Sequence, residues 1–209
     1  MYGNDAPSGT FPFFVSNGLI GGVIIHSHYI LTISGYESSR FGYGLTEQQS
    51  LADILDPSYP YITNVVESIA LGDEEMVIAR VDPPFEFSPT VQPLKISDCS
   101  GPSNPVIGTT IGIFGLGVME SVAYAETMQV TCVETIEFTE TCAIYDKFND
   151  QSVCVPLSAC YSDEGGPIVV EDGGDLYLAA ITRFANCSKL LIDTLPSILL
   201  LKIINFIRS

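Results

Sequence analysis

Hydrophobic positions along this chain gather in short runs that glycine, proline, asparagine, aspartate and serine clusters separate. The runs are rich in β-branched and aromatic residues, which favours strands over helices. We expect strands at residues 11–16, 22–25, 29–34, 76–81, 110–114, 128–135, 167–170 and 176–182. Many short strands with turn signals between them predict an all-β barrel or sandwich.

Helical patterns are scarce in this sequence. Residues 199–208 are one helix candidate and residues 139–147 are another. The segment 98–105 reads DCSGPSNP, which is typical of a loop, and it divides the chain near its middle. We therefore expect two subdomains, at residues 1–98 and 99–209.

The charge of the chain restricts its partners. Hydrophobic residues make up 46% and charged residues 16%, as in a globular protein, and 25 acidic against 8 basic residues give a net charge of −17. This charge excludes nucleic acids and anionic membranes as partners and allows a basic protein partner, or it serves solubility alone. The acids concentrate at Glu47, Asp53, Asp56, Glu67, Asp73, Glu74, Glu75, Glu171, Asp172 and Asp175. No apolar run reaches the roughly 18 residues of a membrane span, and we expect a monomer.

The cysteines indicate an oxidising compartment. There are six, and an even count without a Cys-x-x-Cys pair favours disulfides over metal ligation. We expect a secreted, extracellular protein in a mature or recombinant form, because residues 1–10 are polar and do not resemble a secretory signal. His26 and His28 lie two positions apart on an expected turn without nearby acids, which favours a solvated turn over a zinc site. We predict no metal and no cofactor.

One segment carries candidate chemistry. Residues 162–167 read Ser-Asp-Glu-Gly-Gly-Pro, which resembles the Gly-Asp-Ser-Gly-Gly-Pro signature of the trypsin-like serine proteases. A glutamate stands where that family has its nucleophilic serine. Further blocks resemble the same family in the same order, at residues 5–12, 21–25, 29–36, 75–81 and 87–93. The resemblance covers nearly the whole chain and implies two six-stranded antiparallel β-barrels with a C-terminal α-helix.

The resemblance also implies a degenerate catalytic site. It places Gly35, Glu75 and Glu164 at the family's histidine, aspartate and serine. Glycine cannot transfer a proton, and a carboxylate has no proton for a base to remove at neutral pH. Ser162 replaces the oxyanion-hole glycine, and its Cβ restricts the turn that directs two amides at the oxyanion. We therefore expect that this chain is not an enzyme.

The family's substrate pocket is expected to be closed in this chain. Ser158 falls at the base of the pocket, so a trypsin-like aspartate is missing, while Phe184 and Ser197 replace wall glycines. A phenylalanine is large enough to fill the pocket. The alternative is that Phe184 lies exposed on the rim.

Disulfides and an N-terminal contact follow from the same resemblance. Two family bridges correspond to Cys142–Cys154 and Cys160–Cys187, whereas Cys99 and Cys132 have no counterpart and pair by elimination, unless they are free thiols or form an intermolecular link. Residues 1–4 align with the family's Ile-Val-Gly-Gly start. The Met1 amine would then pair with Asp163, and if Met1 is not the native start a zymogen-like arrangement is the alternative.

Three functions are compatible with these residues. The first is a secreted, non-catalytic protease homologue that binds a basic protein through its acidic surface, as a cofactor or decoy in a proteolytic or immune cascade. The second is an altered hydrolase in which Glu164 and Glu75 act as a carboxylate pair. The third is an inert structural or storage component of a secretion.

Overall fold

Strands form all the regular structure in the residues described by the computed structural model, which are 4–5, 11–35, 39–44, 56–71, 76–96, 110–116, 129–134, 152–156, 163–185 and 189–194. The strands are β1 (Asn4–Asp5), β2 (Phe14–Ser16), β3 (Gly21–His26), β4 (Tyr29–Ile33), β5 (Arg40–Tyr43), β6 (Ile62–Leu71), β7 (Met76–Asp82), β8 (Lys95–Ile96), β9 (Thr110–Gly115), β10 (Gln129–Glu134), β11 (Ser152–Pro156), β12 (Pro167–Asp172), β13 (Asp175–Ala185) and β14 (Lys189–Thr194). Within these ranges, no helix has the length and hydropathy needed to cross a membrane.

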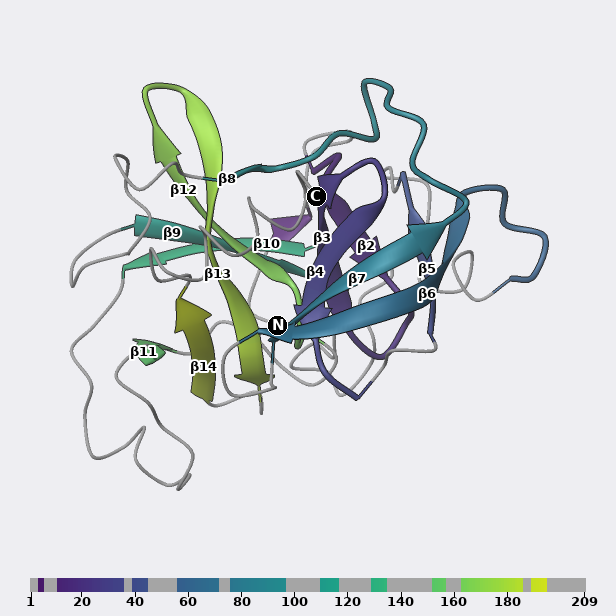
Figure 1. Cartoon of the computed structure of the whole chain (residues 1–209). Helices are drawn as coiled ribbons and strands as arrows, with labels where there is room; N and C mark the ends of the chain where they lie inside the picture. The colour runs from purple at the N-terminus through teal and green to yellow at the C-terminus, as the bar shows by residue number, and fades with distance from the viewer. Residues whose placement is uncertain are drawn as a thin grey trace.

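The first half of the chain closes into an antiparallel barrel. Its strand order is β2-β3-β4-β7-β6-β5 (Figure 1). The ring closes where β2 pairs with β5, with Val15 opposite Tyr43. Closure leaves no long unpaired edge between the first and last strands, which is how barrels avoid edge-to-edge association. This barrel confirms the first of the two that the sequence predicts.

The second half forms an open sheet among the described residues. Strands β9 to β14 follow the path β10-β9-β12-β13-β14-β11, and β1 extends this path beyond β10. Closing these six strands into a barrel would require β11 to pair with β10, and the described part of the chain contains no such pairing. Strand β8 adds a short parallel pairing with β13. Strands β1 and β8 thus belong to the second sheet although both lie within residues 1–98.

Two hydrophobic clusters hold the molecule together. One consists of residues from the barrel strands and the segment 85–91, with Phe41, Ile24 and Ile30 fully buried. The other includes Leu31 and Ile78 of the barrel together with Leu178 of the second sheet. Because this second cluster has members from both halves, it joins them, and their contact positions the candidate site.

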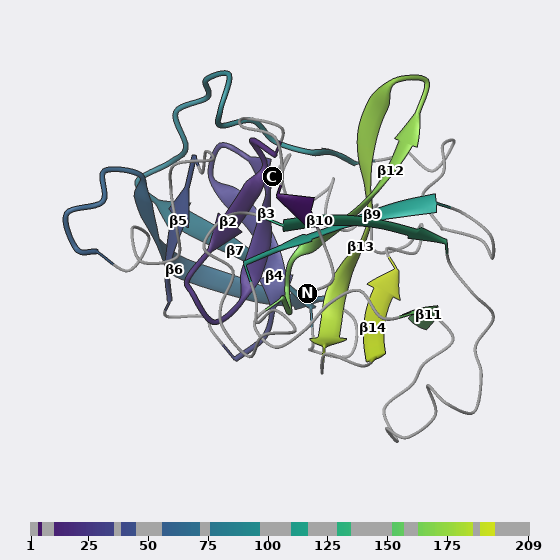
Figure 2. The same ribbon diagram turned by 180° about the vertical axis from the view of Figure 1, so that it is seen from behind.

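The β12–β13 hairpin projects from the second sheet in both views (Figures 1 and 2). Its acidic tip, residues 171–175, is exposed. The two helices expected at residues 139–147 and 199–208 lie outside the described residues.

Candidate functional site

The turn that contains Glu164 is hydrogen-bonded to both the barrel and the second sheet. On the barrel side, the Gly21 amide donates to the Glu164 carbonyl at 2.7 Å. On the sheet side, the Gly165 amide donates to the Thr182 carbonyl at 2.6 Å, and the Thr182 amide donates to the Gly166 carbonyl at 2.9 Å. Three backbone hydrogen bonds therefore fix the turn in which the family carries its nucleophile.

Glycine is required at position 165 by both conformation and space. Its φ is 78°, in the left-handed region that disfavours residues with a Cβ. A Cβ at this position would collide with the Gly21 carbonyl oxygen and lie 2.8 Å from Thr32 Oγ1. Thr32 Oγ1 itself donates to the Gly21 carbonyl at 2.7 Å. The end of β4, the start of β3 and the Glu164 turn thus form one tightly packed junction.

Glu164, the residue at the serine position, is half-buried in this turn. A carboxylate in its ionised form is only an acceptor of hydrogen bonds. It cannot lose a proton to a neighbouring base as a serine hydroxyl does. The turn is well defined, and the residue that the resemblance places at the family's serine is a carboxylate.

Gly35, the residue at the histidine position, follows β4 and is exposed. Its φ is 91°, and no atom lies within 4 Å of the place where a Cβ would be. A Cβ would therefore meet no atom there, but the left-handed conformation disfavours any residue with a Cβ by about 1–2 kcal/mol. The backbone at this position favours glycine.

Glu75, the residue at the aspartate position, lies outside the described residues. It directly precedes Met76, which pairs with Ile33 on β4. Thr182 of β13 is fully buried, and its Oγ1 has no hydrogen-bond partner among the described residues.

Asp163 is buried, with 1% of its surface exposed. A Cβ on Gly115 of β9 would overlap its carboxylate, so the carboxylate lies directly against that glycine. Gly115 pairs with Gln129 of β10, and Gln129 pairs with Asp5 of β1. The N-terminal strand thus belongs to the same part of the sheet as Asp163, while Met1 itself lies outside the described residues.

The expected pocket residues are only in part within the described chain. Ser158, Ser162 and Ser197 lie outside it, and Phe184 belongs to β13. The strand register pairs Phe184 with Leu191 of β14. Sequence reasoning missed Leu191 because β14 was not among the expected strands.

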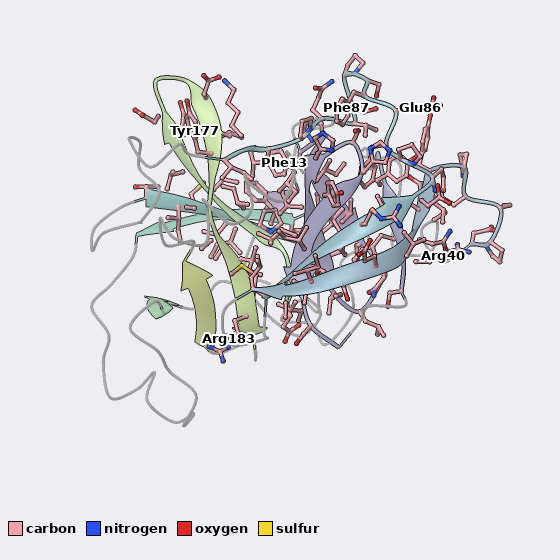
Figure 3. All side chains as sticks on the ribbon, in the orientation of Figure 1. Phe13, Arg40, Glu86, Phe87, Tyr177 and Arg183 are labelled. Atoms are coloured by element: carbon pink, nitrogen blue, oxygen red, sulfur yellow. The ribbon has the colours of Figure 1, made fainter. Side chains whose placement is uncertain are left out.

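Arg183 is a second residue that sequence reasoning missed. It is half-buried at the end of β13, next to Phe184, and its side chain extends to the lower end of the second sheet (Figure 3). In the sequence, Arg183 directly follows Thr182 and precedes Phe184.

The cysteines give one difference from expectation. Cys132 is exposed and is a free thiol, so the structure does not contain the Cys99–Cys132 disulfide. Cys132 lies on β10, and the outcome corresponds to the free-thiol alternative for that residue. Cys99 lies outside the described residues, as do Cys142, Cys160 and Cys187. Cys154 lies on β11, where it pairs with Leu191.

His26 and His28 flank Ser27 at the β3–β4 turn, as the sequence predicts. The Ser27 hydroxyl lies 3.4 Å from His26 Nδ1 and 2.9 Å from His28 Nδ1. Burial lowers the pKa of His26, and the charge of His28 lowers it further. No group of three or more histidine, cysteine, aspartate or glutamate side chains in the described ranges could hold a metal ion.

The sequence matches a known protein family. The family model described as Trypsin matches residues 1–193 of the 209-residue chain. This match includes the barrel, the second sheet and the Glu164 turn. Comparison with curated proteins gave no match. Because the family match extends over most of the sequence, the chain belongs to the trypsin family.

Proposed function

We propose that this chain is a secreted, non-catalytic member of the trypsin family that acts by binding a protein partner of basic charge. The observation that carries the proposal is that two positions of the family's site are changed together. Glu164 stands in the turn that carries the family's nucleophile, and Gly35, in a left-handed conformation, stands at the position of the family's histidine. Neither residue can form the nucleophile and base pair on which acyl transfer depends. The net charge of −17 supports attraction of a basic partner.

Three further features belong to the same proposal. The Met1 amine pairs with the buried Asp163, because the N-terminal strand β1 lies in the same part of the sheet as Asp163, through Gln129 and Gly115. Phe184 and the residues around it close the substrate pocket. Disulfides Cys142–Cys154 and Cys160–Cys187 hold the surrounding loops in an extracellular environment.

A hydrolysis assay tests the loss of catalysis. The purified chain is incubated with mixed fluorogenic peptide substrates beside Glu164→Ala and Glu164→Ser. We expect no hydrolysis above the uncatalysed rate for any of the three, because Glu164→Ser restores a hydroxyl without a base at Gly35. Adding Gly35→His and Glu75→Asp to Glu164→Ser tests whether the remaining scaffold can support the reaction.

The outcome separates the proposal from its alternatives. Hydrolysis of peptides or glycosides by the wild type that disappears in Glu164→Ala would establish the altered hydrolase. If the wild type is inactive, capture from extracellular fluid at low and high salt follows, with a charge-reversed Glu171→Lys/Asp172→Lys variant as the control. Failure of the wild type to retain any protein at either salt concentration favours the storage function.

A further inference from the structure

The turn between β2 and β3 contains the one Asn–Gly pair of the sequence, Asn17–Gly18. Asparagine is thermolabile, and a following glycine exposes it most to deamidation, because no side chain hinders attack by the glycine nitrogen. The Gly18 nitrogen bonds to Asn17 Cγ, the Cγ–Nδ2 bond breaks, ammonia leaves and a succinimide ring remains. Water then opens the ring to aspartate or isoaspartate. The sequence therefore carries a self-modifying pair at this turn.

The fold holds the nitrogen that would attack. The Gly18 amide donates to Ser16 Oγ at 3.0 Å, and Ser16 Oγ donates to the Ile20 carbonyl at 3.0 Å. Gly18 is buried, and Ser16 is only 3% exposed. The nitrogen attacks only after it has lost its proton, and a buried, hydrogen-bonded amide loses its proton when the local structure opens. Deamidation of the folded chain therefore requires opening of this turn.

The side chain that would be attacked is held as well. Asn17 Oδ1 accepts hydrogen bonds from the Leu19 and Ile20 amides, both at 2.8 Å. The Asn17 amide donates to the Ile20 carbonyl at 3.1 Å. Directly after the turn, the Gly21 amide bonds the Glu164 carbonyl at 2.7 Å. Asn17 Cγ can therefore turn toward the next nitrogen only if several hydrogen bonds break.

The β12–β13 hairpin provides an open counterpart (Figure 1). Its tip contains the one Asp–Gly pair of the sequence, Asp172–Gly173, and residues 171–175 are all exposed. Gly173 has a φ of 60°, and no atom lies within 4 Å of its Cβ position. Asp172→Asn would thus place the same reactive pair in a second hairpin turn, with its glycine exposed instead of buried.

We propose that Asn17 is a deamidation site that the fold keeps closed, and that it reacts when the β2–β3 turn opens. Isoaspartate lengthens the backbone by a side-chain carbon, which would displace Gly18 from Ser16 and Gly21 from the Glu164 turn. Modification during a period of unfolding would therefore hinder the return to the native junction. This inference is independent of the proposed binding function, because it concerns the chemistry of the chain itself.

A deamidation time course on the full chain tests the site. Wild type, Asp172→Asn, Ser16→Ala and Leu19→Ala are incubated in mildly alkaline buffer, folded and in denaturant, and peptide mass spectrometry measures acid and isoaspartate at each site. In denatured Asp172→Asn, positions 17 and 172 should react at similar rates. In the folded variant, Asn17 should react at least about 10-fold more slowly than position 172, because only the first turn must open.

Ser16→Ala removes the hydroxyl that holds the Gly18 amide. We expect deamidation of Asn17 to be about 3- to 10-fold faster in this variant, the factor that corresponds to one typical hydrogen bond. Hydrogen exchange of the Gly18 amide should become faster with it. Leu19→Ala is the matched control, because Leu19 lies in the same turn with 57% of its surface exposed and its substitution leaves both backbone amides in place. It should deamidate at the wild-type rate.

Two results would overturn the proposal. One is deamidation of Asn17 in the folded chain as fast as in denaturant; a rate above that in denaturant would mean that the amides on Oδ1 activate the side chain. The other is a Ser16→Ala variant that is folded by circular dichroism and reacts no faster than Leu19→Ala. If Ser16→Ala does not fold, the comparison of the two positions within folded Asp172→Asn decides. None of these results bears on the proposed loss of catalysis.

Discussion

Gly165 shows how much of the trypsin-family site depends on single backbone conformations. Its amide bonds the second sheet, and its missing Cβ allows the Gly21 carbonyl and the Thr32 hydroxyl to approach. The turn is thus held by packing between the two halves of the molecule, whatever side chain stands at position 164.

Replacing Gly165 with alanine should destabilise the chain strongly. The left-handed conformation costs about 1–2 kcal/mol for a residue with a Cβ, and the collision with the Gly21 carbonyl adds to this cost. We expect a loss of about 3 kcal/mol or more in the free energy of unfolding, measured by chemical denaturation.

Gly173→Ala is the matched control for this substitution. Gly173 has a φ of 60° at the hairpin tip and no atom within 4 Å of its Cβ position. It should show the conformational cost alone. Equal losses for the two variants would contradict the close approach at Gly165.

Strands β3, β4 and β13 meet at this junction, and each of two buried threonines there uses its hydroxyl differently. Thr32 on β4 bonds the Gly21 carbonyl of β3 at 2.7 Å. Thr182 on β13 is fully buried, and its hydroxyl has no partner among the described residues. An unsatisfied buried hydroxyl reduces stability, because the hydroxyl loses its bonds to water without replacement.

Valine substitution should therefore have opposite results at the two positions. Thr32→Val leaves the Gly21 carbonyl without that donor and should lower the free energy of unfolding by about 1–3 kcal/mol. Thr182→Val should be neutral or stabilising, because it removes a polar atom that forms no hydrogen bond with any described residue. A loss at Thr182 as large as that at Thr32 would show that its hydroxyl is bonded in solution.

Repulsion between acidic residues acts on the whole molecule. The net charge is −17, and the described part of the chain includes the ion pairs Arg80–Glu67 and Lys95–Asp175, both exposed. Exposed pairs contribute little to stability, so they do not offset the repulsion. An excess of one sign destabilises the compact state through self-repulsion and also directs the approach of an oppositely charged partner.

Added sodium chloride should therefore raise the temperature of unfolding. The screening length falls to about 10 Å at 0.1 M salt, which weakens repulsion between carboxylates on different loops. Thermal unfolding followed by circular dichroism at increasing salt measures the effect. Glu171→Lys/Asp172→Lys reduces the negative charge and should respond less to salt, and an equal response in both proteins would count against overall repulsion as the cause.

Most strands could be predicted because their hydrophobic runs lie between clear turns. The expected run at residues 76–81 corresponds to β7, and the run at residues 167–170 to β12. Strand β6 escaped prediction because its polar and apolar residues do not alternate regularly, and a register shift between Val65 and Glu67 interrupts its pairing with β7. Strands β1 and β8 are too short to produce a pattern. The proposed loss of the nucleophile could be inferred from Glu164 alone, because the motif is contiguous in the sequence.

Local composition was sufficient to predict an all-β chain, and the motif at residues 162–167 was sufficient to predict a glutamate at the family's serine position, since strand preference and side-chain chemistry belong to individual residues and their neighbours. Long-range packing decided the remaining features. The burial of Asp163 against Gly115, the close approach of Gly165 to Gly21 and the burial of Thr182 each depend on residues far apart in sequence. The row of rings from Phe85 through Tyr43 to Tyr61 likewise exists only once β5, the segment before β6 and the loop after β7 have come together.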